Sequence, residues 1–127
     1  MATSIARSPI FVLDCPDASG LASFYSALTG WPIAVDPDAD GDWVELDSGQ
    51  PTTLAFQQVS AYQAPDWPGQ IRPQQAHLDF TVDDLDAAEA SALALGARKH
   101  ANQPGMRYRV FLDPAGHPFC LCQAGGN

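Results

Sequence analysis

The sequence carries one pattern twice. Residues 76–82 alternate apolar and polar side chains as a strand does, and a helix start follows at residues 83–89. Residues 9–15 precede a similar helix start in the first half, and Gly30 and Gly96 follow the two helices. Short strand-like runs separated by Gly, Asp and Pro come after each helix. The repeat predicts two modules of one strand, one helix and several strands, an arrangement typical of chains that enclose a space between the modules.

Capping residues and apolar spacing predict helices over residues 17–29 and 84–95. Asp17 suits the N-cap of the first helix, and Asp83 or Asp84 that of the second. Gly30 and Gly96 suit the C-terminal ends. Each helix has one apolar stripe at helical spacing, formed by Leu21, Phe24, Tyr25 and Leu28 in the first and by Leu85, Ala88, Ala92 and Leu95 in the second.

Strands and turns alternate after each helix. The expected strands cover residues 31–35, 42–47, 52–59, 98–101, 107–113 and 117–123, with turns at 38–41, 48–51 and 113–116. We therefore predict a single domain over residues 1–127, with module one at 8–59, a linker at 60–74 and module two at 75–123. The linker holds three prolines, which exclude a central strand, and Tyr62 and Trp67, which either staple it to the fold or form a lid over a pocket.

The charge and composition of the chain limit the kinds of partner that it is expected to bind. The chain of 127 residues has 15 acidic and 6 basic side chains, a formal charge of −9. Phosphate backbones and anionic membranes repel such a surface, so neither nucleic acid nor a membrane is an expected partner. No apolar run approaches the roughly 20 residues that span a bilayer, and the N-terminus does not resemble a signal peptide. A cytoplasmic protein is the expectation.

The three cysteines do not suggest a disulfide framework, since their number is odd. Cys120 and Cys122 lie two positions apart on an expected strand, which separates their Cα atoms by about 7 Å, beyond comfortable bridging distance. We expect small apolar side chains in a reducing compartment.

Strand alternation separates a core face from an open face. In the strand ending at Val82, Leu78 and Phe80 are expected beneath the second helix, which leaves His77 and Asp79 on the open face. The other expected core residues are Phe11, Leu13, Val44, Leu46, Val110, Leu112, Phe119 and Leu121. The predicted open face collects Trp43, Glu45, Leu54, Phe56, His77, Asp79, Arg107, Arg109, Phe111, Cys120 and Cys122. An apolar concavity with a few polar groups is typical of a small-molecule site, and contact with a second subunit is the alternative.

His77 is the candidate catalytic residue, but a general base in this position needs Asp79 or another acceptor to orient its ring. Cys120 as a nucleophile would need a base and a lowered pKa, so a small apolar role is favoured. Arg109 is expected either to hold a ligand carboxylate or phenolate or to pair with Glu45 or Asp79. His117 is assigned to turn packing and His100 to solvent.

The chain resembles the vicinal oxygen chelate superfamily, the fold of glyoxalase I, bleomycin-resistance proteins and extradiol dioxygenases, and is similar to actinobacterial single-domain glyoxalase-like proteins. The matching stretches are VLDCPD at 12–17, DWP at 66–68, QAHLDF at 75–80, VDDLDAAE at 82–89, LGA at 95–97 and DPAGHPFC at 113–120. The resemblance implies an α+β fold of two βαβββ modules whose sheets curl around a cavity, and often a homodimer.

The resemblance also places the ligands of a divalent metal on the first and last strands of each module. His77 occupies the first-strand position of module two, and Ile10 appears in module one. The last-strand positions hold Leu54 and Cys120. Since catalytic metals need about three protein ligands, we expect no metal and no other cofactor. The alternative is a site of His77, Cys120 and either Glu45 or Asp79.

Three functions remain after the sequence is read. The first is a metal-free protein that binds or sequesters a planar, partly apolar compound. Its expected ligand-binding residues are Trp43, Glu45, Phe56, Tyr62, Trp67, His77, Asp79, Arg109, Phe111 and Cys120. The second is a metal-dependent lyase, isomerase or dioxygenase, and the third is a metal-free enzyme that uses His77. A fold of this kind hosts many reactions and does not choose among them.

Overall fold

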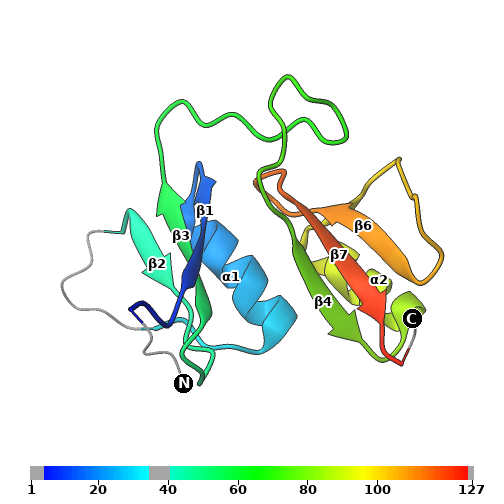
Figure 1. Cartoon of the computed structure of the whole chain (residues 1–127), viewed down its shortest axis with the longest axis horizontal. Coiled ribbons are helices and arrows are strands. Elements are labelled where there is room, and N and C mark those ends of the chain that lie inside the picture. The colour runs from blue at the N-terminus through cyan, green and yellow to red at the C-terminus, as the bar shows by residue number, and fades with distance from the viewer. Residues whose placement is uncertain (1–4, 35–40, 126–127) are drawn as a thin grey trace. The chain divides into compact units, whose positions relative to one another are not determined.

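The computed structural model describes residues 5–34 and 41–125 and divides the chain into two compact units, residues 1–62 and 63–127. Each unit has its own sheet and its own helix (Figure 1). The α+β fold of two modules is confirmed, and both sheets are open rather than closed barrels. The expected turn at residues 38–41 lies largely outside the described residues.

The first unit contains β1 (Ile10–Cys15), α1 (Ala18–Thr29), β2 (Trp43–Glu45) and β3 (Thr53–Gln58). Its strand order is β1-β3-β2, with β1 parallel and β2 antiparallel to β3. The strand expected at residues 31–35 is reduced, over its described part, to one bridge between Ile33 and Leu46.

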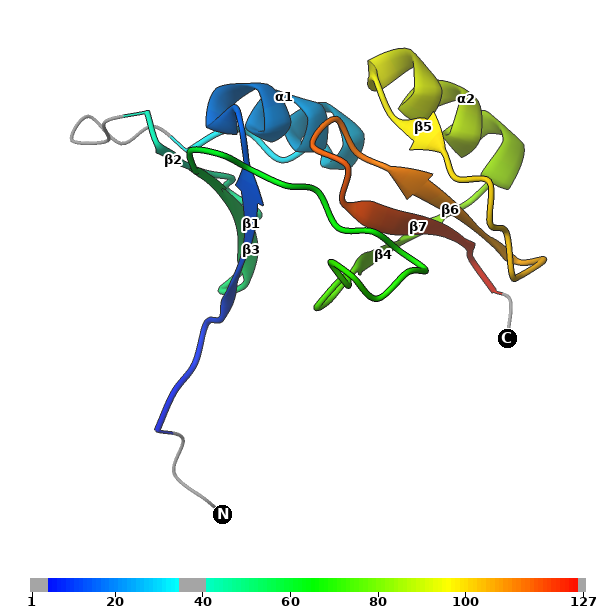
Figure 2. The same cartoon turned by 90° about the horizontal axis from the view of Figure 1, so that it is seen from above.

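The second unit contains β4 (Leu78–Val82), α2 (Leu85–Leu95), β5 (Arg98–Lys99), β6 (Tyr108–Leu112) and β7 (Pro118–Gln123). The strand order is β4-β7-β6-β5, and β4 is parallel to β7 while the other pairs are antiparallel. The first and last strands of each unit are thus parallel neighbours joined through a helix. Figure 2 shows α2 on one face of this sheet and the segment from residue 63 to β4 on the other.

The helix ends explain why the two halves look alike in sequence. Asp17 accepts a hydrogen bond from the Gly20 amide at 3.1 Å, and Asp84 accepts from Asp86 and Ala87 at the start of α2. Gly30 and Gly96 end the helices with φ of 79° and 113°. These are left-handed conformations that favour glycine. Both predicted helices are confirmed to within one residue.

Each core is an aromatic stack beneath a helix. In the first unit, Tyr25 of α1 stacks on Phe56 of β3 with ring centroids 5.5 Å apart. In the second, Phe119 stacks on Phe111 at 5.7 Å and meets Phe80 edge-on at 6.2 Å. Burying one such side chain is worth roughly 1.5–3 kcal/mol, so these stacks fix which face of each strand turns toward its helix.

The stack in the first unit corrects one predicted face. Phe56 and Leu54 were expected on the open face, but Phe56 packs on α1 and Leu54 shares its side of β3. Ala55 occupies the open side instead. Gln58 of β3 is the counterpart of Gln123 of β7, because each pairs with the last residue of the first strand in its unit.

The second unit corrects the face of β6. Phe111 stacks in the core, and Arg109 contacts α2, so both lie on the helix side, and Val110 faces the other way with Cys120. Arg107 also lies near the start of α2, at a hollow of about 240 Å³. The prediction was wrong because apolar residues occupy three successive positions in β6, so alternation did not define its core face.

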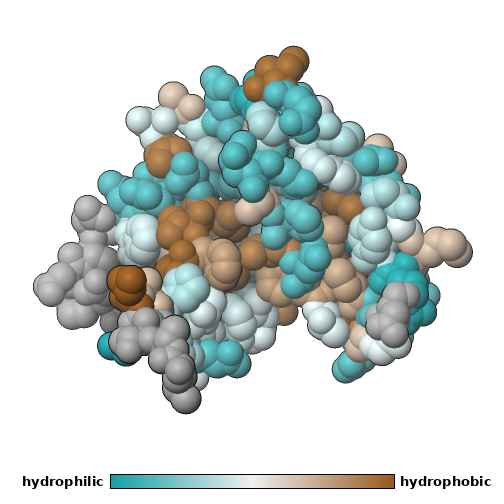
Figure 3. Space-filling view, viewed as in Figure 1, coloured by the Kyte–Doolittle hydropathy of each residue, from teal (hydrophilic) through white to brown (hydrophobic). Residues whose placement is uncertain are grey.

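β1 is an edge strand with exposed apolar side chains. Ile10, Phe11 and Val12 are 42%, 50% and 39% exposed, although Phe11 was expected in the core. Figure 3 shows apolar atoms gathered over this strand. Within the described part of the chain, no helix has the length and apolar character needed to cross a membrane.

Candidate functional site

A pocket of about 180 Å³ lies in the second unit, on the face of its sheet that turns away from α2. It is lined by Trp67, Gln74, His77, Pro104, Tyr108, Val110, Pro118 and Cys120. Its volume is below the roughly 300 Å³ at which typical ligand pockets begin. The pocket therefore suits a single ring or one end of a larger molecule.

The floor of the pocket is built from β6 and β7. Tyr108 pairs with Cys122, Val110 with Cys120 and Leu112 with Pro118. Paired residues point to the same face, and the intervening residues of both strands point toward α2. Val110 and Cys120 are 2% and 7% exposed, so this floor is packed closely beneath the opening.

A polar corner borders the floor where β4 meets β7. His77 Nε2 lies 3.1 Å from Asp79 Oδ1, and these side chains are 44% and 57% exposed. Each of His77, Asp79 and Cys120 offers one ligand atom, and the three atoms lie within 4.8 Å of one another. Two neighbouring strands thus bring an imidazole, a carboxylate and a thiol together.

The thiol in this corner is held neutral. Burial, together with the charge of the nearby Asp79 carboxylate and the hydrogen bond that it accepts, raises the pKa of Cys120 to about 12. Burial also raises the pKa of Cys122. A nucleophilic cysteine needs the opposite shift, so Cys120 is a wall of the pocket rather than an attacking group.

One wall comes from the segment before β4. Trp67 lies in a loop closed by a hydrogen bond from the Asp66 amide to the Arg72 carbonyl at 2.6 Å, and Arg72 Nε also donates to the Ala64 carbonyl. The Trp67 ring meets the ring of His100 edge-on, with centroids 5.0 Å apart. His100 was expected in solvent and is instead half-buried in this contact.

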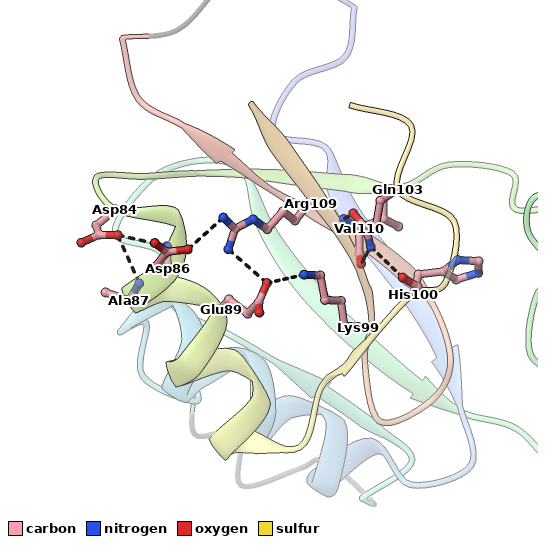
Figure 4. A network of polar contacts seen from close by, with 9 residues as sticks. All are labelled: Asp84, Asp86, Ala87, Glu89, Lys99, His100, Gln103, Arg109 and Val110. Carbon is pink, nitrogen blue, oxygen red and sulfur yellow. Dashed lines mark hydrogen bonds and ion pairs between the residues drawn. The ribbon is translucent and has the colours of Figure 1, made fainter. Parts of the chain in front are cut away.

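Arg109 lies on the other face of the sheet, in a charged network with α2 (Figure 4). Its guanidinium donates to Glu89 at 3.1 Å and to Asp86 at 2.9 Å, and Lys99 of β5 also reaches Glu89 at 3.1 Å. The hydrogen bond with Asp86 is the largest cause that raises the pKa of Arg109. These ion pairs connect α2 with β5 and β6, and they hold the Arg109 guanidinium on the face of the sheet opposite the pocket.

The structure brings together part of the predicted site. His77, Asp79 and Cys120 converge, and Trp67 joins His77 and Cys120 in the lining. Arg109 and Phe111 lie on the helix side of the second sheet, and Phe56 on that of the first. The remaining candidates, Trp43, Glu45 and Tyr62, belong to the unit of residues 1–62, in which Trp43 and Glu45 lie on the side of β2 away from Phe56.

Sequence reasoning missed Gln74, Pro104, Tyr108, Val110 and Pro118 as lining residues. For β6 a usable signal existed, because Val110 pairs directly with Cys120. Placing Cys120 on the open face therefore requires Val110, and with it Tyr108, to lie there too. Gln74 and Pro104 lie in connecting segments, where alternation gives no information.

Comparison with known proteins identifies this architecture. A family model described as a glyoxalase-like domain matches residues 10–122. The chain therefore belongs to the glyoxalase-like family, within the vicinal oxygen chelate superfamily. No curated protein matches the sequence.

Solved structures share the fold at low sequence identity. A glyoxalase/bleomycin resistance protein/dioxygenase family enzyme from Burkholderia phytofirmans is 18% identical, with a TM-score of 0.68 over 93% of this chain and 98% of its own. A fosfomycin resistance protein from Mesorhizobium loti is 15% identical, with a TM-score of 0.67 over 98% and 94%. A lactoylglutathione lyase from Agrobacterium tumefaciens is 17% identical, with a TM-score of 0.61 over 97% and 96%. These neighbours differ in activity, so they establish the fold alone.

The two units can be aligned by their matching backbone hydrogen bonds, and this alignment shows which residues occupy the expected metal-ligand positions. The Val59 amide bonds to the Cys15 carbonyl as the Ala124 amide bonds to that of Val82. With these pairs aligned, Ile10 corresponds to His77, and Ala55, not Leu54, corresponds to Cys120. The counterparts in the first unit therefore offer no donor atom. The donors His77, Asp79 and Cys120 of the second unit form a mixed nitrogen, oxygen and sulfur set that suits a borderline ion such as zinc.

Proposed function

We propose that this protein binds a small, flat and partly apolar molecule in the pocket of its second unit, without a divalent metal. The observation that carries the proposal is the lining itself. Trp67, Tyr108 and Val110 supply apolar surface, and His77 adds a polar group to the lining. An apolar pocket with few polar groups is the common form of a small-molecule site.

The polar corner formed by His77, Asp79 and Cys120 would orient the bound ligand. A carboxylate accepts hydrogen bonds and does not donate them, so Nε2 of His77 carries the proton that faces Asp79. In the neutral imidazole, Nδ1 then remains as an acceptor for a hydroxyl group of the ligand. The neutral Cys120 thiol adds a soft, weakly polar surface beside it.

Binding is tested with 4-hydroxyacetophenone, which has one ring, a hydroxyl and a carbonyl. We expect saturable shifts of backbone amide signals at His77, Val110 and Cys120 in an NMR titration. Two matched variants in β6 distinguish the pocket face of the sheet from the face that packs on α2. Tyr108→Leu should weaken binding by about tenfold, the value of roughly 1.4 kcal/mol of lost contact. Phe111→Leu should lower the melting temperature and leave binding within about twofold of the original value.

Two results would contradict the proposal. No saturable shift at these residues would reject the proposal for this class of ligand. Equal loss of binding in Tyr108→Leu and Phe111→Leu would mean that binding follows stability rather than the pocket.

A metal-dependent lyase, isomerase or dioxygenase is the second candidate, favoured by the convergence of His77, Asp79 and Cys120 within 4.8 Å. A divalent ion held there would polarise an oxygen atom of a substrate. Metal analysis of protein purified without a histidine tag separates the candidates. The metal-free proposal expects no stoichiometric zinc, nickel, iron or manganese. Stoichiometric metal that is lost in both His77→Ala and Cys120→Ala would establish the second candidate instead.

A further inference from the structure

Trp67 forms a wall of the pocket from a loop that belongs to neither the helix nor the sheet of its unit. A loop side chain lacks the ladder of hydrogen bonds that fixes a residue in a strand. The position of Trp67 therefore depends on the groups that touch it. Within the described residues, His100 provides both a ring contact at 5.0 Å and a polar contact at 3.0 Å.

His100 is itself firmly placed. It follows β5, and its amide bonds to the Val110 carbonyl at 3.0 Å, which extends the pairing of β5 with β6. Gln103 Nε2 donates to both the His100 and the Val110 carbonyls at 2.8 Å, and Gln103 Oε1 accepts from the Val110 amide (Figure 4). His100 is thus attached to the strand that forms the floor of the pocket.

Two contacts define the form of its ring. The Asn102 amide donates to Nδ1 at 2.9 Å, so Nδ1 is an acceptor. Nε2, 3.0 Å from the Trp67 carbonyl, must then carry the proton and donate it. The neutral ring with hydrogen on Nε2 satisfies both contacts at once.

We propose that His100 is a positioning residue, which holds Trp67 as a wall of the pocket through the bond from Nε2 to the Trp67 carbonyl. His100 does not line the pocket and acts through Trp67. The proposal rests on the proposed function, because it assigns His100 a role in ligand affinity only where this pocket is the binding site.

Two variants test the two ring nitrogens of His100 one at a time. His100→Gln places an amide nitrogen near the position of Nε2, and His100→Asn places an amide oxygen near that of Nδ1 but does not reach Trp67. We expect His100→Gln to bind 4-hydroxyacetophenone within about threefold of the original protein. His100→Asn should bind about tenfold more weakly, since one hydrogen bond that fixes the wall is lost.

The fluorescence of Trp67 provides a readout that needs no ligand. In a Trp31→Phe, Trp43→Phe background, the emission comes from Trp67, the remaining one of the chain's three tryptophans. We expect a shift to longer wavelength in His100→Asn and none in His100→Gln. Melting temperatures of the variants check that each one folds.

The outcomes distinguish this inference from the proposed function. Unchanged emission in His100→Asn would overturn the positioning role, and so would equal affinities of the Asn and Gln variants. An emission shift without any saturable ligand binding would keep the structural contact but reject both the role in affinity and the proposed function.

Discussion

Gly105 packs against the ring of Tyr108, so closely that a Cβ atom at position 105 would overlap the ring carbons. Tyr108 lines the pocket, and Pro104, the neighbour of Gly105, lines it too. The absence of a side chain at position 105 thus sets where the Tyr108 ring lies. Sequence inspection gives no hint of this contact, because the glycine stands in an ordinary connecting segment.

Gly105→Ala should therefore displace the Tyr108 ring and change the shape of the pocket. We expect weaker binding of 4-hydroxyacetophenone, by about three- to tenfold, and only a small loss of stability, because the half-buried ring can turn aside. Gly49→Ala is the contrasting case, with backbone strain at φ of 71° but no atoms near the missing side chain, so it should lower stability and leave binding unchanged. Isothermal titration and urea unfolding measure the two effects. Unchanged binding in Gly105→Ala would show that the ring does not shape the site.

Asp113 holds the turn between β6 and β7. The side chain is fully buried, and Oδ1 accepts hydrogen bonds from the Ala115 amide at 2.8 Å and the His117 amide at 3.0 Å. Asp113→Ala leaves these amides without that acceptor, so we expect unfolding to become easier by about 1–3 kcal/mol. Asp113→Asn keeps a side-chain oxygen and should cost less. Equal losses in the two variants, measured by urea unfolding, would contradict this account.

The raised pKa of Cys120 predicts slow alkylation. In a Cys15→Ala, Cys122→Ala variant, the rate of reaction with iodoacetamide should keep rising with pH toward about 12, because only the thiolate reacts. Burial is the largest cause of the raised pKa and remains in an added Asp79→Asn variant, but the variant removes the carboxylate that adds to it, so the rate at pH 8 should increase. Mass spectrometry follows the modified fraction. A rate that levels off near pH 9, the ordinary pKa of a thiol, would disprove the shift.

Glu89 should matter more to stability than Asp86. Glu89 contacts both Arg109 and Lys99 and has a side chain 22% exposed, whereas Asp86 contacts Arg109 and has one 89% exposed. Exposed ion pairs contribute about 0–1 kcal/mol. Glu89→Gln should fall at the upper end of that range and Asp86→Asn near zero, with both effects reduced by salt. Thermal unfolding at low and high salt makes the comparison, and a larger loss in Asp86→Asn would refute it.

The expectation of a homodimer remains a prediction, supported by the apolar side chains along the edge strand β1. Light scattering should give the mass of two chains at micromolar concentration. Val12→Lys, on an exposed side chain of this edge, should shift the mass toward one chain. A mass of one chain at all concentrations would exclude the dimer.

The sequence predicted the fold well because local signals agreed. Asp17 and Gly30 mark the ends of α1 by hydrogen bonds within a few residues, and the turn at residues 113–116 likewise depends on its own side chains. Such signals require no knowledge of distant contacts.

The site was predicted less well because it depends on partners far away in the chain. Arg109 suggested a ligand contact, and only the placement of Glu89 on α2 shows that its charge is already paired. His77 and Asp79 were placed correctly, since strict alternation defines both faces of β4. Trp67 and His100 meet across 33 residues, a contact that no local pattern specifies.

The parallel pairing of the first and last strands in each unit has a consequence for how such a chain can change its chemistry. Ile10 and Ala55 in one unit, and His77 and Cys120 in the other, lie on the faces that turn away from the aromatic stacks. Exchanging an apolar side chain for a ligating one at these places leaves Tyr25 on Phe56, and Phe111 on Phe119, as they are. The side chains that could bind a ligand and the side chains that stabilise the core therefore lie on opposite faces of the same strands, so that either set can change while the other is kept.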